Sequence, residues 1–226
     1  MFEDFFGGHS TRISATRLAR RGRVRAEGYL VAKRCLDIAL VLLTAPASLV
    51  LIGLLAALVR LDGGHAFYTQ ERLGRNGRVF PLWKLRSMVP DADERLRQYL
   101  AENPEAQQEW ASSQKLKNDP RVTALGRYLR KYSLDELPQL WNVLVGDMSL
   151  VGPRPMFPVQ RVLYPGTAYF DFRPGLTGLW QISERNGCTF AERATYDNRY
   201  AESVSLATDL QVLFKTVAVV FRGTGC

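Results

Sequence analysis

The stretch Tyr132–Pro155 reads YSLDELPQLWNVLVGDMSLVGPRP, and the rest of the chain is best understood outward from it. It places two adjacent carboxylates, Asp135 and Glu136, shortly before an arginine held between two prolines, Arg154. The run from Ser133 to Glu136 has the form of a capping box, in which the serine side chain accepts from the N3 amide and the glutamate reaches back. The sequence therefore predicts a helix that begins at the carboxylate pair.

The residues that follow have the period of an amphipathic helix that ends at Gly146. The predicted apolar face consists of Leu137, Leu140, Trp141 and Leu144. The predicted polar face consists of Asp135, Gln139 and Asn142. Pro138 lies in the first turn, where a proline removes an intrahelical hydrogen bond and kinks the chain. We expect a strained turn at this point.

The position of the two carboxylates predicts their charge state. Amides at a helix N-terminus favour a negative charge, so Asp135 and Glu136 are expected to stay ionised. An ionised carboxylate suits a nucleophile or a metal ligand better than a general acid, which needs a raised pKa. A well-capped helix without any chemistry is the alternative interpretation of the same residues.

Composition limits the class of protein. The 226 residues carry a net charge of +8 and are enough for one large or two small domains. Residues 1–34 hold eight Lys/Arg against three Asp/Glu, which is typical of a segment with an anionic partner, either lipid head groups or nucleic acid. Residues 1–32 are accordingly predicted to be a basic N-terminal arm, either mobile or a helix on a membrane surface.

Cysteine and histidine usage excludes several kinds of site. Cys35, Cys188 and Cys226 are odd in number and widely spaced, which argues against a disulfide framework or a zinc site and favours a reducing compartment. The two histidines, His9 and His65, lie in no recognisable motif. Histidine base catalysis is not expected, and the chain has no Walker A loop or dinucleotide-binding fingerprint.

The segment Ile38–Val59 has 22 residues without a charge. It is long enough for one helix to cross a membrane, but Pro46 divides it and basic residues flank both ends. The positive-inside rule cannot be satisfied on both sides by one crossing. A re-entrant helix over residues 33–60, broken at Pro46 and returning to the cytoplasmic side, is the favoured prediction; a true span and a buried soluble helix are the alternatives.

Two strands joined by a turn at Asn76-Gly77 are predicted next, over Ala66–Gln70 and Val79–Met88. Because side chains alternate along a strand, Phe80, Leu82, Lys84 and Arg86 are expected on one face. Two cations close together on one face indicate either solvated surface or a phosphate site.

The remaining segments are predicted as follows. Residues 90–103 form a charged helix, 104–110 a polar surface excursion, 174–181 a ligand loop around an exposed Gln181, and 205–221 an apolar final helix. An apolar stripe with basic neighbours precedes the carboxylate pair and consists of Val122, Leu125, Leu129 and Tyr132.

Five motifs, in order, resemble the bacterial polyprenyl-phosphate sugar-1-phosphate transferases, the small monotopic phosphoglycosyl transferases that start exopolysaccharide and related glycan assembly. They are KLRSM at residues 84–88, DPRVT at 119–123, SLDELPQL at 133–140, GPRP at 152–155 and RPGLTGLWQ at 173–181. The likeness covers Lys33 to about Gly225. It departs from the family pattern at Ala45, Glu184 and Val204.

The resemblance implies a fold and a place in the cell. The expected fold is mainly α with a small β-hairpin element (α+β), as a monotopic membrane protein whose catalytic domain, residues 61–226, includes membrane-surface helices and lies on the cytoplasmic face of the bacterial inner membrane. Implied partners are a UDP-sugar, undecaprenyl phosphate, membrane lipids and downstream glycosyltransferases, with no nucleic acid. The oligomeric state and the identity of the hexose stay open, with galactose or glucose favoured by analogy.

The resemblance also implies a reaction and its residues. A hexose 1-phosphate passes from the UDP-sugar to undecaprenyl phosphate with release of UMP, Asp135 is the nucleophile, and Glu136, with Asp135 beside it, holds Mg²⁺. Residues expected to bind the substrate phosphates or the nucleotide are Lys84, Arg86, Arg154, Arg127, Arg173 and Gln181. The alternative is a non-catalytic membrane-anchored module that binds anionic lipid or nucleic acid through its basic arm.

Overall fold

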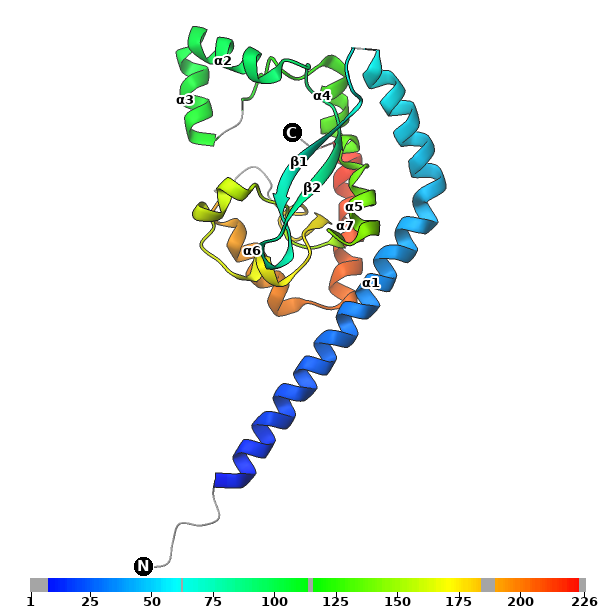
Figure 1. The fold of residues 1–226 in the computed structure, drawn as a ribbon, viewed down its shortest axis with the longest axis vertical. Coiled ribbons are helices and arrows are strands. Elements are labelled where there is room, and N and C mark those ends of the chain that lie inside the picture. Colours follow the sequence, from blue (N-terminus) through cyan, green and yellow to red (C-terminus); the bar gives the residue numbers. More distant parts are fainter. Residues whose placement is uncertain (1–7, 62, 114–115, 184–189, 224–226) are drawn as a thin grey trace, which may run out of the picture.

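The computed structural model describes residues 8–61, 63–113, 116–183 and 190–223. Helix α1, Gly8–Arg60, runs without interruption through the expected boundary at residue 32. Its N-terminal half projects away from the rest of the chain, and its C-terminal half curves along one side of the domain (Figure 1). Glu184 and Cys226 lie outside the described residues.

Pro46 lies inside α1 and does not end it. Two residues before the proline, the Thr44 hydroxyl donates to the carbonyl of Leu40 at 2.8 Å. Figure 1 shows α1 bending in this region, as expected where a proline removes a helical hydrogen bond. The predicted break is therefore a bend in a continuous helix.

Both ends of the apolar segment of α1 pack on the same domain. Val41 belongs to the main hydrophobic core, and Leu55 and Val59 belong to a second core. Between these contacts α1 is exposed, with large apolar side chains at Leu42, Leu43, Leu49, Val50 and Leu54. The helix thus leaves the domain surface and returns to it.

The predicted hairpin is confirmed. Strand β1, Phe67–Leu73, pairs antiparallel with β2, Val79–Leu85, across the short 3₁₀ turn η1, Arg75–Gly77. Asn76 and Gly77 have φ of 58° and 76°, the left-handed conformation that these residue types tolerate. Strand β2 ends before Arg86. The strand face that was expected to carry Phe80, Leu82, Lys84 and Arg86 therefore ends at Lys84.

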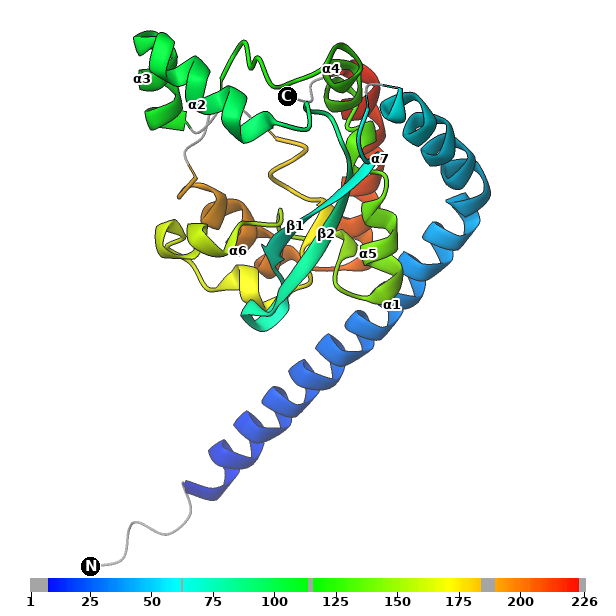
Figure 2. The ribbon, with the colours of Figure 1, turned by 45° about the horizontal axis from the view of Figure 1, so that its top comes forward.

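Three helices follow the hairpin: α2, Ala92–Glu102, α3, Pro104–Ser113, and α4, Ala124–Lys131. Residues 104–110, expected as a surface excursion, are helical. Figures 1 and 2 both show α2 and α3 on the side of the domain away from α1. Helix α4 begins at Thr123, whose side chain accepts from the Gly126 amide.

A second, small sheet was not predicted from the sequence. Strand β3, Ser149–Val151, pairs parallel with β4, Gly175–Thr177, in the segment expected to be a loop. A Cβ on Gly175 would lie 2.1 Å from the Gly152 amide nitrogen, so only glycine permits this close approach. The 3₁₀ turns η3, Pro158–Leu163, and η4, Ala168–Asp171, lie between the two strands in sequence.

The chain ends in α6, Arg193–Ser203, and α7, Leu206–Arg222. The final helix has one face on the core and one face exposed. Val212 is buried in the main core, whereas Phe214, Val217 and Phe221 are exposed. Mainly α architecture with a small β element is therefore confirmed.

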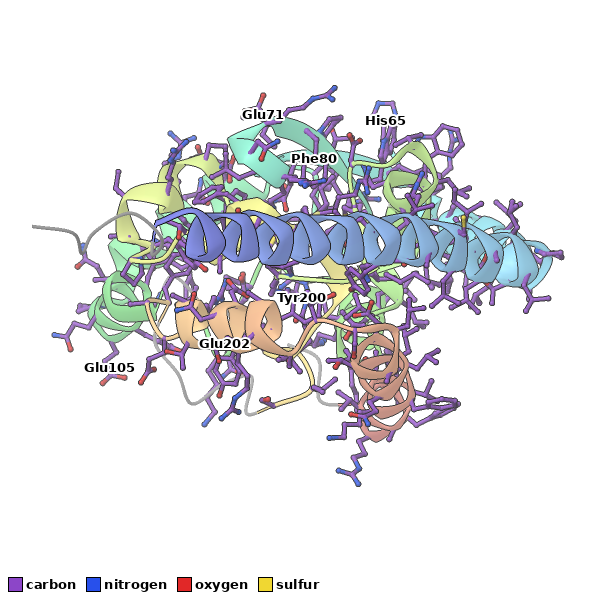
Figure 3. The ribbon with its side chains drawn as sticks, turned by 90° about the horizontal axis from the view of Figure 1, so that it is seen from below. His65, Glu71, Phe80, Glu105, Tyr200 and Glu202 are labelled. Atoms are coloured by element: carbon purple, nitrogen blue, oxygen red, sulfur yellow. The ribbon has the colours of Figure 1, made fainter. Side chains whose placement is uncertain are left out.

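A buried polar cluster fastens α1 to the last two helices. The Asp209 carboxylate accepts from Lys33 at 2.9 Å, from Tyr29 at 2.7 Å and from Tyr200 at 2.8 Å. Figure 3 shows Tyr200 beside α1. Because Lys33 and Asp209 are both almost inaccessible to solvent, this ion pair fixes the angle at which α1 enters the domain.

Candidate active site

The segment that carries the carboxylate pair is a strained turn and not a capped helix. Ser133 has φ of 55°, its side chain makes no capping hydrogen bond, and Leu134–Glu136 form the 3₁₀ turn η2. Pro138 then precedes α5, Gln139–Val145, which ends at Gly146 in the left-handed conformation. The predicted capping box is wrong, because a serine in this conformation turns the chain out of the geometry that a box requires.

The predicted polar face of α5 is buried, whereas on the predicted apolar face only Trp141 turns outward, because Leu137, Leu140 and Leu144 still pack against buried clusters. Gln139 and Asn142 are buried, with 2% and 1% of their surface exposed, while Trp141 is 58% exposed. Leu140 and Leu144 pack only partly against the core. Asn142 can occupy the inner face because it finds hydrogen-bond partners there.

Asn142 shows how this inner polar face holds the site together. Its Nδ2 donates to the Pro81 carbonyl at 2.8 Å, and its Oδ1 accepts from the Trp83 amide at 3.0 Å. One side chain thus satisfies a donor and an acceptor on the edge of β2, beside Lys84. The contact fixes the position of β2 relative to α5.

Lys84 and Arg154 converge on the carboxylate pair. The Lys84 Nζ lies 3.1 Å from Glu136 Oε1 and 3.7 Å from Asp135 Oδ2. An Arg154 Nη lies 3.4 Å from the same Glu136 oxygen. The tertiary structure therefore brings together four of the residues predicted from sequence, two anions and two cations.

Asp135 is 6% exposed, and its burial raises the pKa of its carboxyl above the usual range. Lys84 lowers this pKa, Glu136 raises it, and Arg130 and Arg154 lower it. This direction differs from the expectation based on a helix N-terminus, because η2 is a single turn and desolvation is the larger effect. The ionised form that a nucleophile needs therefore depends on the neighbouring cations.

Two further arginines belong to this cluster and were not predicted. Arg130 donates from Nε to the Ser87 hydroxyl at 2.9 Å and is one of the cations that act on Asp135. Arg72 stacks 3.4 Å above the Phe157 ring, and burial, then Arg154, lower its pKa to about 10. In the sequence, the basic residues beside the apolar stripe that ends at Tyr132 pointed to Arg130. No sequence pattern pointed to Arg72.

Three predicted residues lie elsewhere. The guanidinium of Arg86 donates to carbonyls at the end of α1 and in the loop after it, among them Val59 and His65, each at 2.9 Å, so it caps α1. Arg127 is exposed on α4. Arg173 donates to the Gly146 carbonyl at 2.8 Å, at the opposite end of α5 from Asp135.

Gln181 is 2% exposed, so the prediction of an exposed polar group in a loop is wrong. Beside it, Trp180 faces a hollow that adjoins Arg154. The hollow is lined by aromatic, basic and acidic side chains: Arg154, Met156, Tyr164, Trp180, Phe190, Arg193 and Asp197. Such a mixture can hold a ring together with an anion.

The residues present fit one small divalent cation. No group of three or more His, Cys, Asp or Glu gathers anywhere in the described part of the chain. Mg²⁺ in phosphate chemistry is commonly bound through one or two carboxylates plus substrate phosphates, with water completing the shell. Asp135 and Glu136 supply such a pair.

Comparison with known proteins agrees with this geometry. The family described as bacterial sugar transferase matches residues 28–223. Exopolysaccharide production protein ExoY of Rhizobium meliloti is 46% identical over 90% of this chain and 91% of its own length. The undecaprenyl-phosphate galactose phosphotransferase of Salmonella typhimurium is 50% identical over 74% of this chain, which spans 36% of that protein.

The UDP-galactose-lipid carrier transferase of Erwinia amylovora is 45% identical over 85% of this chain and 41% of its own length. The matched family profile spans all the residues of the carboxylate cluster. This chain therefore belongs to the bacterial sugar transferase family, the polyprenyl-phosphate sugar-1-phosphate transferases, and is an enzyme of the phosphoglycosyl transferase class.

Proposed function

We propose that this enzyme transfers a hexose 1-phosphate from a UDP-sugar to undecaprenyl phosphate, releases UMP, and thereby begins exopolysaccharide or related glycan synthesis. The observation that carries the proposal is a buried carboxylate, Asp135, held beside a cation-bound carboxylate, Glu136, at the edge of an aromatic and basic hollow. Names of relatives that include undecaprenyl phosphate, UDP-galactose and glucose support the substrate classes.

The proposed reaction has two steps. A carboxylate oxygen of Asp135 attacks the phosphorus that bears the sugar, the bond from that phosphorus to the bridging oxygen breaks, and UMP leaves. The sugar phosphate is then joined to Asp135 as an acyl phosphate. An oxygen of undecaprenyl phosphate attacks the same phosphorus, the bond to Asp135 breaks, and the free carboxylate is regenerated.

Charge neutralisation is the main demand of this chemistry, because each step brings two anions together. Lys84, Arg130 and Arg154 surround the carboxylates and would offset that charge. Glu136, with Asp135, would hold Mg²⁺, which when bound supplies further neutralisation of the diphosphate. Arg154 also borders the hollow that would take the nucleotide.

Attachment to the membrane is proposed to be re-entrant. Helix α1 contains a stretch, Gly28–Arg60, that is long and apolar enough to cross a membrane. Only 11% of its apolar 18-residue window is buried inside the protein. Because Val41 and Val59 both pack on one domain, the two ends of the stretch belong on one side of a bilayer. This arrangement supports a monotopic protein, and the cytoplasmic face of the inner membrane is its proposed location.

The test is release of UMP by the full chain in nanodiscs, given undecaprenyl phosphate, Mg²⁺ and a panel of UDP-hexoses. Release with one sugar, lost in Asp135→Asn and after EDTA, is expected. A phosphosugar trapped on Asp135 during turnover would establish the two-step route. No release from folded, membrane-bound protein across the panel would contradict the proposal and favour a non-catalytic lipid-binding module.

A further inference from the structure

A second hollow, separate from the carboxylate cluster, lies where α1 meets the domain. Its charged lining consists of Lys33, Arg34, Asp37, Arg75, Asp171 and Arg173. Arg173 was expected at the active site, yet it lies here, at the far end of α5 from Asp135. A helix of seven residues is about 10 Å long, so the two sites are distinct.

Three guanidinium groups line this hollow, and two of them, those of Arg34 and Arg173, are held by carbonyls at the C-terminal end of α5. Arg34 donates through both Nη atoms to the α5 carbonyls, to Val143 and, at 2.7 Å, to Leu144. The Nε of Arg173 donates to the carbonyl of Gly146, which follows α5. Burial lowers the pKa of Arg173, and the positive charges of Arg34 and Arg75 lower it further. Crowding of like charges costs free energy that an anion between them would offset.

The acidic residues of the hollow do not neutralise this cluster. Lys33 is already paired with Asp209. Asp37 is buried and accepts from the Ser149 hydroxyl at 2.7 Å and from the Leu150 amide at 3.2 Å. Asp37 and the exposed Asp171 oppose Arg34, Arg75 and Arg173, and with two acidic groups against three cations the hollow carries net positive charge.

The position of the hollow identifies the source of the anion. Arg34 precedes the exposed Leu42 by about two turns of α1, roughly 12 Å. On α5, Val145 is exposed next to Gly146, the carbonyl of which Arg173 binds. Apolar surface thus borders a basic hollow, as at the depth of lipid head groups.

We propose that this hollow binds the phosphate of an anionic membrane phospholipid, with Arg34, Arg75 and Arg173 as the binding residues. The inference rests on the proposed attachment of α1 to a membrane, but not on the proposed reaction. A phosphate bound here would cross-link α1 to the C-terminal end of α5. It would thereby stabilise the junction between the membrane helix and the catalytic domain.

The experiment uses the full chain with Asp135→Ala, so that binding is measured without turnover. Protein in non-ionic detergent is titrated with short-chain phosphatidylglycerol, short-chain phosphatidylcholine or inorganic phosphate, and the thermal unfolding midpoint is followed. Phosphatidylglycerol is expected to raise the midpoint at a concentration at least tenfold below that of either other ligand. UMP release by the chain with Asp135 intact is assayed separately, so failure of the reaction and failure of this site are distinguishable.

Two variants and one matched control locate the effect. Arg75→Gln and Arg173→Gln are expected to need at least tenfold more phosphatidylglycerol for the same stabilisation. Arg78→Gln, which removes an exposed arginine near the same turn but outside the hollow, is expected to behave like the parent. Arg75 is exposed, so its replacement tests the site even if Arg173→Gln does not fold.

Two outcomes would overturn the proposal. Equal responses of Arg75→Gln and Arg78→Gln would show that phospholipid acts elsewhere. Stabilisation by inorganic phosphate as strong as that by phosphatidylglycerol would assign the hollow to a soluble anion and not to a lipid.

Discussion

The Nζ of Lys84 lies 3.1 Å from Oε1 of Glu136, and this contact joins the hairpin to the turn that carries the proposed nucleophile. The two side chains are 13% and 16% exposed. In such a partly desolvated setting a charge pair is stronger than on an open surface. The position of Lys84, and through it the charge state of the site, depends on the register of β2.

Replacement of Lys84 by methionine is expected to lower the rate of UMP release on the order of 10²-fold, the usual effect of losing one electrostatic donor. Lys84→Arg keeps the charge and is expected to retain more activity than Lys84→Met. The control is Lys117→Met, which removes an exposed lysine. Equal rates for Lys84→Met and the parent enzyme would remove Lys84 from the mechanism.

Gly126→Ala is expected to disturb the contact between α4 and the segment after β2. A Cβ at this position would lie 1.9 Å from the Ser87 carbonyl oxygen, and overpacking of this kind costs roughly 1 to 3 kcal/mol. Because Arg130 binds the Ser87 side chain, activity should fall as well. Thermal unfolding and UMP release measure both effects, and Gly53→Ala, with open space around it inside α1, should lower neither.

Asp197 predicts a pH dependence of stability. Burial raises its pKa to about 6, while the hydrogen bond from Tyr164 and the charge of Arg193 act in the opposite direction. The unfolded chain has an aspartate pKa of about 3.9, so the folded state binds more protons between these values. Stability contributed by protonated Asp197 is thus present below about pH 4 and is lost as the pH rises through about 6.

The corresponding variant is Asp197→Asn, which keeps an acceptor for the Tyr164 hydroxyl. Its free energy of unfolding should match that of the parent near pH 4 and exceed it by about 1 to 2 kcal/mol at pH 8. Denaturant unfolding in detergent at both pH values measures this difference. The exposed Asp93→Asn serves as control; a similar gain in that variant would contradict the assignment to Asp197.

Lys33→Met is expected to cost about 3 to 5 kcal/mol, because it leaves the carboxylate of Asp209, which is 1% exposed, without its cation. Adding Asp209→Asn should recover much of the loss, since the tyrosine hydroxyls of the cluster can still donate to the amide oxygen. Thermal unfolding of the single and double variants tests this. A double variant less stable than Lys33→Met would argue against charge burial as the cause.

Local sequence was sufficient for features that depend on neighbouring residues. Asn76-Gly77 predicted the hairpin because few residue pairs tolerate its positive φ angles, and Gly146 predicted the end of α5 for the same reason. The uncharged run from Ile38 predicted the apolar part of α1. The adjacent Asp135 and Glu136, and the prolines on both sides of Arg154, marked the site.

Periodicity failed where burial is decided by distant partners. Gln139 and Asn142 look like the solvent face of a helix, but Asn142 is buried because the edge of β2, about 60 positions earlier in the sequence, supplies its hydrogen bonds. The strand pair β3 and β4 is too short for a periodic signal. Asp135 was expected to stay ionised from its place at a helix N-terminus, whereas its environment comes from residues of three other segments.

The sequence by itself determined which groups are chemically able to act: the carboxylate pair, the cations of its motifs, and an apolar segment bent by Pro46. Only the tertiary structure decided which of those cations lie beside the carboxylates and which lie elsewhere. It places Lys84, Arg130 and Arg154 at the carboxylates, Arg86 at the end of α1, and Arg173 in the second basic hollow. The physical reason is that charge and conformational preference are properties of single residues, whereas desolvation and pairing exist only between segments that folding brings together.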